Sequence, residues 1–281
     1  MESLQRCDLF LEESSSLQET KPLQSYEVSQ QKWNVQSGDT WLLGHHRMVC
    51  GDSTNAEVAQ KALNGVVPFM MVTDPPYGVN YDPSWRDKFA ILFPDSGIGN
   101  GNNTATGEVF NDSECDWEAA WKHFPGDVSY IWCDALQSPT ILQSLRNNDF
   151  TERCEIVWNK DKFVFGRSHY HWKHEVCWYA VRNKKKANWI GGYKEVTVWD
   201  IPRNRKNKSG HSTEKPLECM ARPIRNHDSE YIYDPFLGSG TTLIACEQLN
   251  RKCIGIELNP AYCSIVLERF LCETGRMPIR E

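Results

Sequence analysis

The chain has 281 residues, a hydrophobic content of 40% and a formal net charge of −6, which is ordinary for a globular protein. The acidic balance excludes a surface that is basic throughout, but it says nothing about local basic patches. No stretch is long and apolar enough to span a bilayer, and the N-terminal segment lacks the basic start and apolar core of a secretory signal. We therefore expect a cytoplasmic protein with no membrane partner.

Eleven cysteines favour the same compartment. Their number is odd, none forms a C-x-x-C pair, and many lie in apolar segments, which predicts reduced thiols in a protein core. One cluster raises the alternative of a zinc site: His169, His171, His174 and Cys177. Because no second ligand pair follows at a standard spacing, we expect no metal.

The ordered domain is predicted to span residues 38–275. Residues 1–37 are polar and weakly patterned, which predicts a flexible N-terminal arm, and residues 276–281 form a short tail. Apolar residues on both sides of a Gly-His-His turn predict a hairpin over residues 40–52, and residues 54–65 have the pattern of a helix. The domain thus begins with strands, a helix and the strand described next.

The apolar run Val66–Thr73 is too short for a helix and predicts a buried strand. It leads into Asp74, Pro75, Pro76 and Tyr77, and the prolines end the strand in a stiff turn. A carboxylate and an aromatic ring are therefore expected at the carboxyl edge of a sheet, where α/β proteins bind ligands. The Gly- and Asn-rich stretch 80–116 follows, either as a loop that closes over this site or as a surface insertion.

Strand and helix patterns then recur, which predicts an α/β sheet flanked by helices. Residues 115–126 and 138–150 are predicted helices, the second with Ser138 as N-cap. Predicted strands cover residues 127–134, 154–160 and 175–182.

Residues 182–208 form a basic segment in an acidic chain. The segment contains nine lysines and arginines and only two carboxylates, which gives a local net charge of +7. Three aromatic residues are interleaved with them. Phosphate neutralisation combined with stacking requires such a composition, so we predict a DNA-contacting segment over residues 182–210. The predicted contacts are Lys184, Lys185, Lys186, Arg203, Arg205, Lys206 and Lys208.

A second chemical centre lies at residues 231–242, where a strand, a glycine-rich turn and a helix follow one another. The turn is neither a phosphate-binding P-loop nor a G-x-G-x-x-G fingerprint. Glu257 ends the next strand, where an acidic side chain can accept both hydroxyls of a ribose. Asn259 and Pro260 begin the last helix, which Gly275 ends. These features predict a nucleoside cofactor.

Three motifs in this order resemble a known family. Asp74–Tyr77, then His211-Ser-Thr-Glu-Lys-Pro216, then Asp234-Pro-Phe-Leu-Gly-Ser-Gly-Thr-Thr242 are similar to the S-adenosylmethionine-dependent amino-methyltransferases of DNA in the circularly permuted β arrangement. The resemblance covers about residues 38–275 and implies a Rossmann-like methyltransferase sheet with a small basic insertion. Ser212 and Glu214 depart from the family's usual H-P-T-Q-K-P.

The resemblance implies methyl transfer to an exocyclic amine of a base that is flipped out of double-stranded DNA. The four residues of the first motif would be catalytic: Asp74 and the Pro75 carbonyl would accept the hydrogens of the amine, and Tyr77 would stack on the base. The residues implied for S-adenosylmethionine are Asp52, Asp234, Phe236, Gly238, Ser239, Gly240, Thr241, Glu257, His211, Thr213 and Lys215.

Several alternatives remain at this point. Within the family, Asp at the first position of the first motif, here Asp74, occurs more often in enzymes that methylate adenine N6 than in those that methylate cytosine N4. Adenine is therefore the predicted target and cytosine the alternative. A catalytically silent DNA-binding protein, or an enzyme acting on RNA or on a protein glutamine, would share the same fold. The resemblance also implies a restriction-modification role and pairing into a homodimer.

Overall fold

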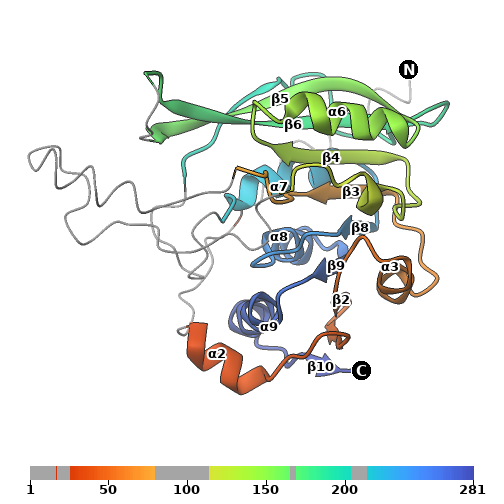
Figure 1. Cartoon of the computed structure of the whole chain (residues 1–281), viewed down its shortest axis with the longest axis vertical. Helices are drawn as coiled ribbons and strands as arrows, with labels where there is room; N and C mark the ends of the chain where they lie inside the picture. The colour runs from red at the N-terminus through yellow and green to blue at the C-terminus, as the bar shows by residue number, and fades with distance from the viewer. Residues whose placement is uncertain (1–16, 18–25, 80–113, 165–168, 204–213) are drawn as a thin grey trace, which may run out of the picture.

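This computed structural model of the protein describes residues 17, 26–79, 114–164, 169–203 and 214–281. The described chain forms one mixed sheet with helices on both faces (Figure 1). The strands are β1 (Thr40–Leu43), β2 (His46–Cys50), β3 (Met70–Thr73), β4 (Val128–Cys133), β5 (Phe150–Val164), β6 (Trp172–Arg182), β7 (Val198–Asp200), β8 (Tyr231–Asp234), β9 (Lys252–Glu257) and β10 (Ile279–Arg280).

The order of strands across the sheet is β10-β1-β2-β9-β8-β3-β4-β6-β5-β7. The late strands β8 and β9 therefore lie between the early strands β2 and β3. Strands β2, β9, β8, β3 and β4 are mutually parallel, so their carboxyl ends meet at one edge. Carboxylates that end or directly follow these strands are Asp52, Glu257, Asp234, Asp74 and Asp134. The fold thus gathers both chemical centres at one sheet edge.

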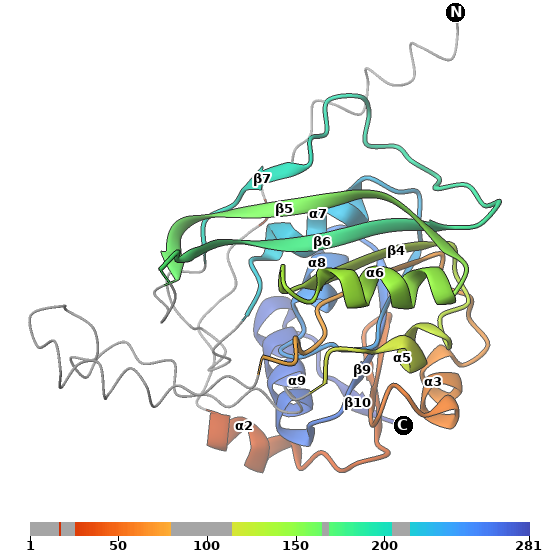
Figure 2. The same cartoon turned by 45° about the horizontal axis from the view of Figure 1, so that its top comes forward.

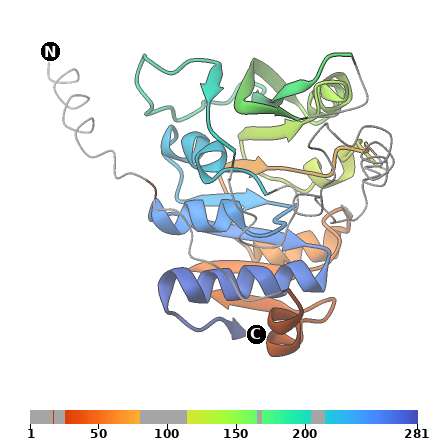
Figure 3. The ribbon, with the colours of Figure 1, turned by 90° about the vertical axis from the view of Figure 1, so that its left-hand side faces the viewer.

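The helices are α2 (Tyr26–Trp33), α3 (Ala56–Leu63), α5 (Glu118–Trp121), α6 (Ser138–Asn147), α7 (Leu217–Arg225), α8 (Thr241–Gln248) and α9 (Pro260–Thr274). Helices α8 and α9 lie side by side against one face of the sheet (Figure 3). Strand β3 shows how the two cores form. Met70 and Val72 pack with residues of α7, α8 and α9, whereas Met71 packs with residues of α3, α5 and α6, because successive side chains point to opposite faces.

Local sequence signals predicted several elements correctly. Asn55 accepts the backbone N–H groups of Glu57 and Val58 and so caps α3. Gly275 ends α9 with a left-handed φ of 70°, as a terminal glycine predicts. The hairpin β1–β2 and the strands β4, β8 and β9 are also confirmed.

Several predicted boundaries were wrong. Strands β5 and β6 are both longer than predicted, and β5 begins at Phe150, which lies within the predicted range of the preceding helix. Strand β3 begins at Met70 rather than Val66, because Pro68 has no backbone N–H to give to a ladder. Helix α5 covers only Glu118–Trp121, since i→i+3 hydrogen bonds tighten the chain after it. Ser138 is not the N-cap of α6. Its hydroxyl donates to Glu155 Oε1 at 2.6 Å, and Gln137 occupies the cap position.

Helix α2 corrects part of the predicted flexible arm. It packs against α9, and Trp33 Nε1 donates to Glu268 Oε2 at 2.9 Å. The predicted tail contains β10, in which Ile279 pairs with Leu42 of β1. Helix α7 and strand β7 had no sequence prediction. In the described part of the chain, no helix has the length and apolarity to span a membrane.

The basic segment is divided between the two edges of the sheet that are formed by the strand ends, one at the carboxyl ends of the parallel strands and one at their amino ends. Val181 of β6 pairs with Val128, the first residue of β4, so β6 ends at the edge opposite Asp74. The chain then arches along the sheet to β7, which runs parallel to β5 and returns to the first edge (Figure 2). His227 anchors the arch, with its ring nitrogens 2.6 Å from the Ala187 oxygen and 2.9 Å from the Tyr130 hydroxyl.

Candidate active site

The turn after β3 brings the Asp74 carboxylate and the Tyr77 hydroxyl together. Tyr77 donates a hydrogen bond to Asp74 Oδ1 at 2.7 Å. Gly78 follows with a φ of +70°, and a Cβ there would lie 2.9 Å from that of Cys115. The Trp117 indole also donates to the Pro76 oxygen at 2.9 Å. Both described ends of the long loop are therefore packed beside Asp74–Tyr77, although residues 80–113 themselves lie outside the described residues.

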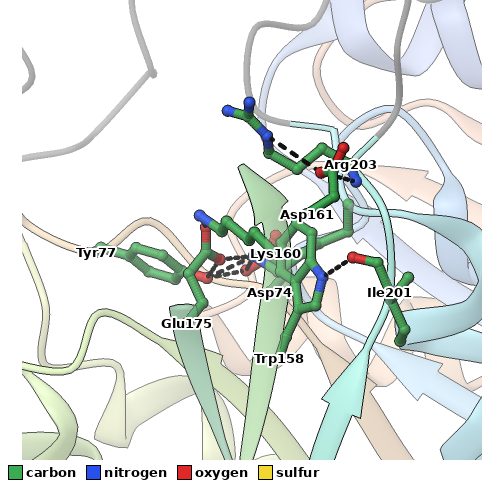
Figure 4. A network of polar contacts seen from close by, with 9 residues as sticks. Asp74, Tyr77, Trp158, Lys160, Asp161, Glu175, Ile201 and Arg203 are labelled. Atoms are coloured by element: carbon green, nitrogen blue, oxygen red, sulfur yellow. Dashed lines mark hydrogen bonds and ion pairs between the residues drawn. The ribbon is translucent and has the colours of Figure 1, made fainter. Parts of the chain in front are cut away.

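Lys215 lies at the centre of this site. Its ammonium Nζ is 2.8 Å from Asp74 Oδ1, 2.6 Å from the Tyr77 hydroxyl and 2.6 Å from Glu175 Oε2. The residues come from β3, β6 and the start of α7, and the side chains of Asp74, Tyr77 and Glu175 point toward one another (Figure 4). The Lys215 side chain is only 5% exposed, so its charge is met by protein groups.

A second lysine completes the cluster. Lys160 Nζ lies 2.5 Å from Glu175 Oε1, so each oxygen of Glu175 faces one ammonium group. We call Asp74, Glu175, Lys160 and Lys215 the charge cluster. It holds two negative and two positive groups. Burial of charge is tolerated when partners are this close.

The cluster sets the protonation states of its members. Burial raises the pKa of Asp74, and the Lys215 charge acts in the opposite direction. Burial also acts to raise the pKa of Glu175, but the charges of Lys215 and Lys160 outweigh it and lower that pKa to about 2. Glu175 is therefore an anion at every working pH. Although burial opposes it, the two carboxylates raise the pKa of Lys215 above its ordinary value, so the lysine stays protonated.

Aromatic rings line the same space. Lys215 Nζ lies 5.0 Å from the centroid of the Tyr77 ring, 5.5 Å from that of Trp132 and 5.9 Å from that of Trp158. The Trp158 indole donates to the Ile201 oxygen at 2.6 Å (Figure 4). Lys215 is thus held among aromatic rings as well as carboxylates.

The glycine-rich turn lies two strands from Asp74, between β8 and α8. Gly238 and Gly240 have φ values of 56° and 85°. A Cβ on Gly240 would lie 3.1 Å from Val266, which leaves little room for any other residue. Phe236 packs against the ring of Trp117, with centroids 4.9 Å apart. The turn thus presents backbone and one aromatic face to the sheet edge.

Two buried carboxylates flank the turn. Burial raises the pKa of Asp234 to about 6 against a hydrogen bond from Thr73, and burial raises that of Glu257 to about 7 against backbone N–H groups. Glu257 accepts from Gly238 N at 2.7 Å and from Asn259 N at 2.8 Å, one on each oxygen. A carboxylate has about four lone-pair sites, so each oxygen can accept one further donor.

The residues present fit a nucleoside with a positive charge nearby. Glu257 has acceptor capacity for ribose hydroxyls, and burial raises the pKa of both carboxylates, a cost that a neighbouring cation or hydroxyl donor would offset. Asp52 lies close to Glu257 in the sheet. Cys50 pairs with Glu257, and Gly51 N donates to the backbone carbonyl oxygen of Glu257 at 2.9 Å. The exposed Asp52 carboxylate accepts from Thr54 N at 2.9 Å.

A buried ion pair joins the turn to the segment that carries Lys215. Arg269 of α9 lies 2.8 Å from Glu214, and the two side chains are 3% and 6% exposed. The same guanidinium donates to the Ser239 oxygen at 3.1 Å and lies 3.2 Å from the Thr241 hydroxyl. Glu214, which departs from the family pattern, is thus the counter-ion of Arg269.

The predicted site residues lie at both ends of the strands. Lys215, whose predicted role is near the methionine end of the cofactor, contacts Asp74 and Tyr77. Exposed Lys184, Lys185 and Lys186 lie at the sheet edge opposite Asp74, where Lys185 Nζ is 3.7 Å from Asp127. Arg203 lies at the same edge of the sheet as Asp74, and its backbone N–H donates to Asp161 at 3.0 Å (Figure 4). The predicted residues outside the described ranges are His211, Thr213, Arg205, Lys206 and Lys208.

The histidines of the zinc alternative make ring contacts. His171 stacks on Phe163 with centroids 5.1 Å apart, and His174 packs edge-on against Trp172 at 5.4 Å. Cys177 is buried in β6. Over the described ranges, no group of three or more His, Cys, Asp or Glu side chains is arranged to hold a metal ion.

Sequence reasoning missed Glu175, Lys160 and Arg269. Glu175 and Lys160 belong to predicted strands, but their convergence depends on the order of β4, β6 and β5 in the sheet. The buried arginine interrupts the apolar face of a helix, and that is a local signal for an ion pair.

Comparisons with known proteins identify the family of the chain. A family model described as DNA methylase, for N6 and N4 methyltransferases, matches residues 69–268. The type II methyltransferase M.Cfr9I of Citrobacter freundii is 33% identical over 147 residues, which cover 45% of this chain and 46% of M.Cfr9I. The chain thus spans about half the length of that relative.

Two further proteins match over more of the chain. The type II methyltransferase M2.MboI of Moraxella bovis is 27% identical over 221 residues, 72% of this chain and 80% of M2.MboI. The crystal structure of the M1.HpyAVI–SAM complex has a TM-score of 0.54 and 25% identity, and the match covers 79% of this chain and 98% of that one. Since the family model covers most of the chain, including both strand-end motifs, the chain belongs to the family of N6/N4 DNA methylases.

Proposed function

We propose that this protein transfers a methyl group from S-adenosylmethionine to the exocyclic amine of a base in double-stranded DNA, with adenine N6 as the target. The observation that carries the proposal is the meeting of Asp74 and Tyr77 with the glycine-rich turn and Glu257 at one sheet edge. The M1.HpyAVI structure, which holds SAM, supports the cofactor assignment.

The role of the first motif follows from the chemistry of the amine. The lone pair of an exocyclic amine is delocalised into the base, so the nitrogen is a poor nucleophile. Asp74 and the Pro75 carbonyl would accept its hydrogens and favour a tetrahedral nitrogen whose lone pair points at the methyl group. Tyr77 would stack on the flipped base, a contact worth roughly 1–3 kcal/mol.

The glycine-rich turn and its carboxylates would hold S-adenosylmethionine. When bound, this cofactor supplies a methyl group on a positively charged sulfur. Glu257 would accept hydrogen bonds from the ribose hydroxyls, and Phe236 would contact the nucleoside. Asp52 would accept a hydrogen bond from the amine of the cofactor's adenine. The backbone of Gly238–Thr241 would pass close to the ligand.

The pKa of Glu257 makes the cofactor affinity depend on pH. Ribose hydroxyls need the carboxylate as acceptor, so binding favours the deprotonated form. We expect the affinity to rise as the pH increases through about 7 and then to level off. The dissociation constant of 5′-deoxy-5′-methylthioadenosine, measured by calorimetry between about pH 6 and 8, checks this without the amino-acid group of the cofactor. Glu257→Gln should bind more weakly with a flat profile; an unchanged slope in this variant would contradict the assignment.

The DNA-contacting surface of the proposal lies at the catalytic edge. Strand β4 is about 17 Å long at about 3.3 Å per residue, and the lysine turn 184–186 lies at its far end. By contrast, the β5–β6 hairpin extends past Glu175 and carries exposed Lys162 and Lys173. With Arg203, these residues form what we call the edge cations.

Salt titration distinguishes the two sets. For every phosphate that a variant no longer neutralises, the slope of log K against log salt becomes shallower by about 0.9. We expect Lys162→Ala/Lys173→Ala/Arg203→Ala to reduce the slope of duplex binding by about 2–3. The matched triple variant Lys184→Ala/Lys185→Ala/Lys186→Ala should leave the slope unchanged. The reverse pattern would place the duplex at the opposite edge of the sheet.

The base itself is decided by mapping methylated positions. DNA from cells that express the native protein, compared with DNA from cells that express Asp74→Ala, should contain N6-methyladenine in one sequence context. N4-methylcytosine in a specific sequence context would show instead that cytosine is the target. If neither the native protein nor Asp74→Ala methylates DNA, and both are folded, the result would favour a catalytically silent DNA-binding protein.

A further inference from the structure

The ammonium group of Lys215 occupies the place where the proposed function needs the target amine. Its nitrogen lies 2.8 Å from Asp74 Oδ1, which is hydrogen-bonding distance from the proposed acceptor. The nitrogen also lies 2.6 Å from the Tyr77 hydroxyl, so it sits beside the hydroxyl edge of that ring and leaves the ring face to the base. An amine that donates to Asp74 Oδ1 from a base stacked on Tyr77 would therefore meet Lys215 Nζ at that oxygen. The lysine and the base compete for the same acceptor.

Glu175 gives the lysine a second partner. It holds Lys215 at 2.6 Å through Oε2, and Lys160 fixes its other oxygen at 2.5 Å. Lys160 is itself buried and lies 4.9 Å from the centroid of the Trp158 ring. The carboxylate of Glu175 is thus anchored independently of Asp74. A lysine that leaves Asp74 can keep its ion pair with Glu175.

Charge balance favours this arrangement in the protein without DNA. Without a cation beside it, Asp74 would be a buried and uncompensated carboxylate, and such groups take up a proton. With Lys215 in place, Asp74 stays close to a charge that favours its acceptor form. The neutral amine of a base can then replace the ammonium group at Asp74 while the lysine remains paired nearby.

We propose that Lys215 is a positioning residue that holds the amine site when no base is bound, and that it yields Asp74 to the target amine while remaining paired with Glu175. This inference rests on the proposed function. It assigns Lys215 to the target side of the reaction rather than to the cofactor. Base entry is then an exchange of one nitrogen for another at Asp74.

Binding of two matched duplexes tests the exchange. Both carry the mapped site with the target position mispaired; one has adenine there and the other has purine, which lacks the 6-amine. S-adenosylhomocysteine is present so that no transfer occurs. At a pH high enough to keep Asp74 ionised, the adenine need not displace the lysine in Lys215→Met. The preference for adenine over purine should then rise about tenfold over native, about the effect of one charge-assisted hydrogen bond.

Lys252→Met is the matched control, because it removes a lysine that pairs with a carboxylate, Glu230 at 2.6 Å, away from Asp74, and it should leave the preference near the native value. A preference in Lys215→Met at or below native would overturn the proposal, since Lys215 would then support the base in place. An equal rise in both variants would also overturn it. Transfer by Lys215→Met should in addition need a higher pH than native, because Asp74 loses the charge that lowers its pKa.

The native protein provides an independent test, in which a variant serves only to assign one resonance. With ¹⁵N-labelled lysine, the Lys215 ammonium resonance, identified by its loss in Lys215→Arg, should shift with the adenine duplex and not with the purine duplex. A resonance unmoved by adenine would overturn the exchange. Methyl transfer by the native protein to the adenine duplex is measured first, because its absence would refute the proposed function rather than the role of Lys215.

Discussion

Asp74→Ala should lower the rate of methyl transfer at least a thousandfold, or about 4 kcal/mol of activation free energy, while the affinity for S-adenosylmethionine changes less than threefold. The reason is geometric. Asp74 accepts hydrogen bonds from Tyr77 and Lys215 at the end of β3, whereas the glycine-rich turn follows β8 and Glu257 ends β9. Single-turnover transfer and calorimetric cofactor binding provide the two measurements.

Asp134 offers a matched control for this variant. It follows the neighbouring parallel strand β4 at the same edge, and its side chain accepts the Leu136 N–H at 2.8 Å. Asp134→Ala should leave transfer within a few-fold of native. A comparable loss of cofactor affinity in Asp74→Ala would contradict the division between an amine site and a cofactor site.

Arg269→Met should cost about 3–5 kcal/mol of unfolding free energy, because it leaves Glu214 as a buried charge without its guanidinium partner. The same change removes the hydrogen bonds to Ser239 and Thr241, so we also expect weaker cofactor binding. Urea unfolding followed by tryptophan fluorescence measures the first effect, and calorimetry measures the second.

Two comparisons test the cause of this loss. Arg225→Met breaks an ion pair with Glu218 that is 42% and 29% exposed, and such pairs contribute at most about 1 kcal/mol. The double variant Glu214→Gln/Arg269→Met removes both buried charges and should recover part of the stability. If Arg225→Met and Arg269→Met lowered the free energy of unfolding equally, the buried charge of Glu214 would not be the cause of the loss in Arg269→Met.

Local patterns were enough to predict the carboxylates at the strand ends. Asp74, Asp234 and Glu257 each end or directly follow an apolar run that becomes a buried strand, and parallel strands present their carboxyl ends at one edge. The glycines of the turn were also readable, since few other residues adopt their positive φ values. The fold class therefore followed from sequence.

The charge cluster was not predictable in the same way. Lys215 and Asp74 are separated by 141 positions in the chain, and Glu175 reaches them only because β6 runs antiparallel between β4 and β5. The direction of β6 also places Lys184–Lys186 at the far edge, which charge counting along the sequence does not reveal. Both features depend on strand order, and a single sequence does not specify strand order.

Methyl incorporation by the purified protein tests the central claim most directly. Native protein is incubated with S-adenosylmethionine labelled in the methyl group and a duplex carrying the mapped site, and the DNA is digested to nucleosides and separated. We predict label in N6-methyldeoxyadenosine, at least a thousandfold less with Asp74→Ala. Saturated cofactor binding with no label in any nucleoside would contradict the account.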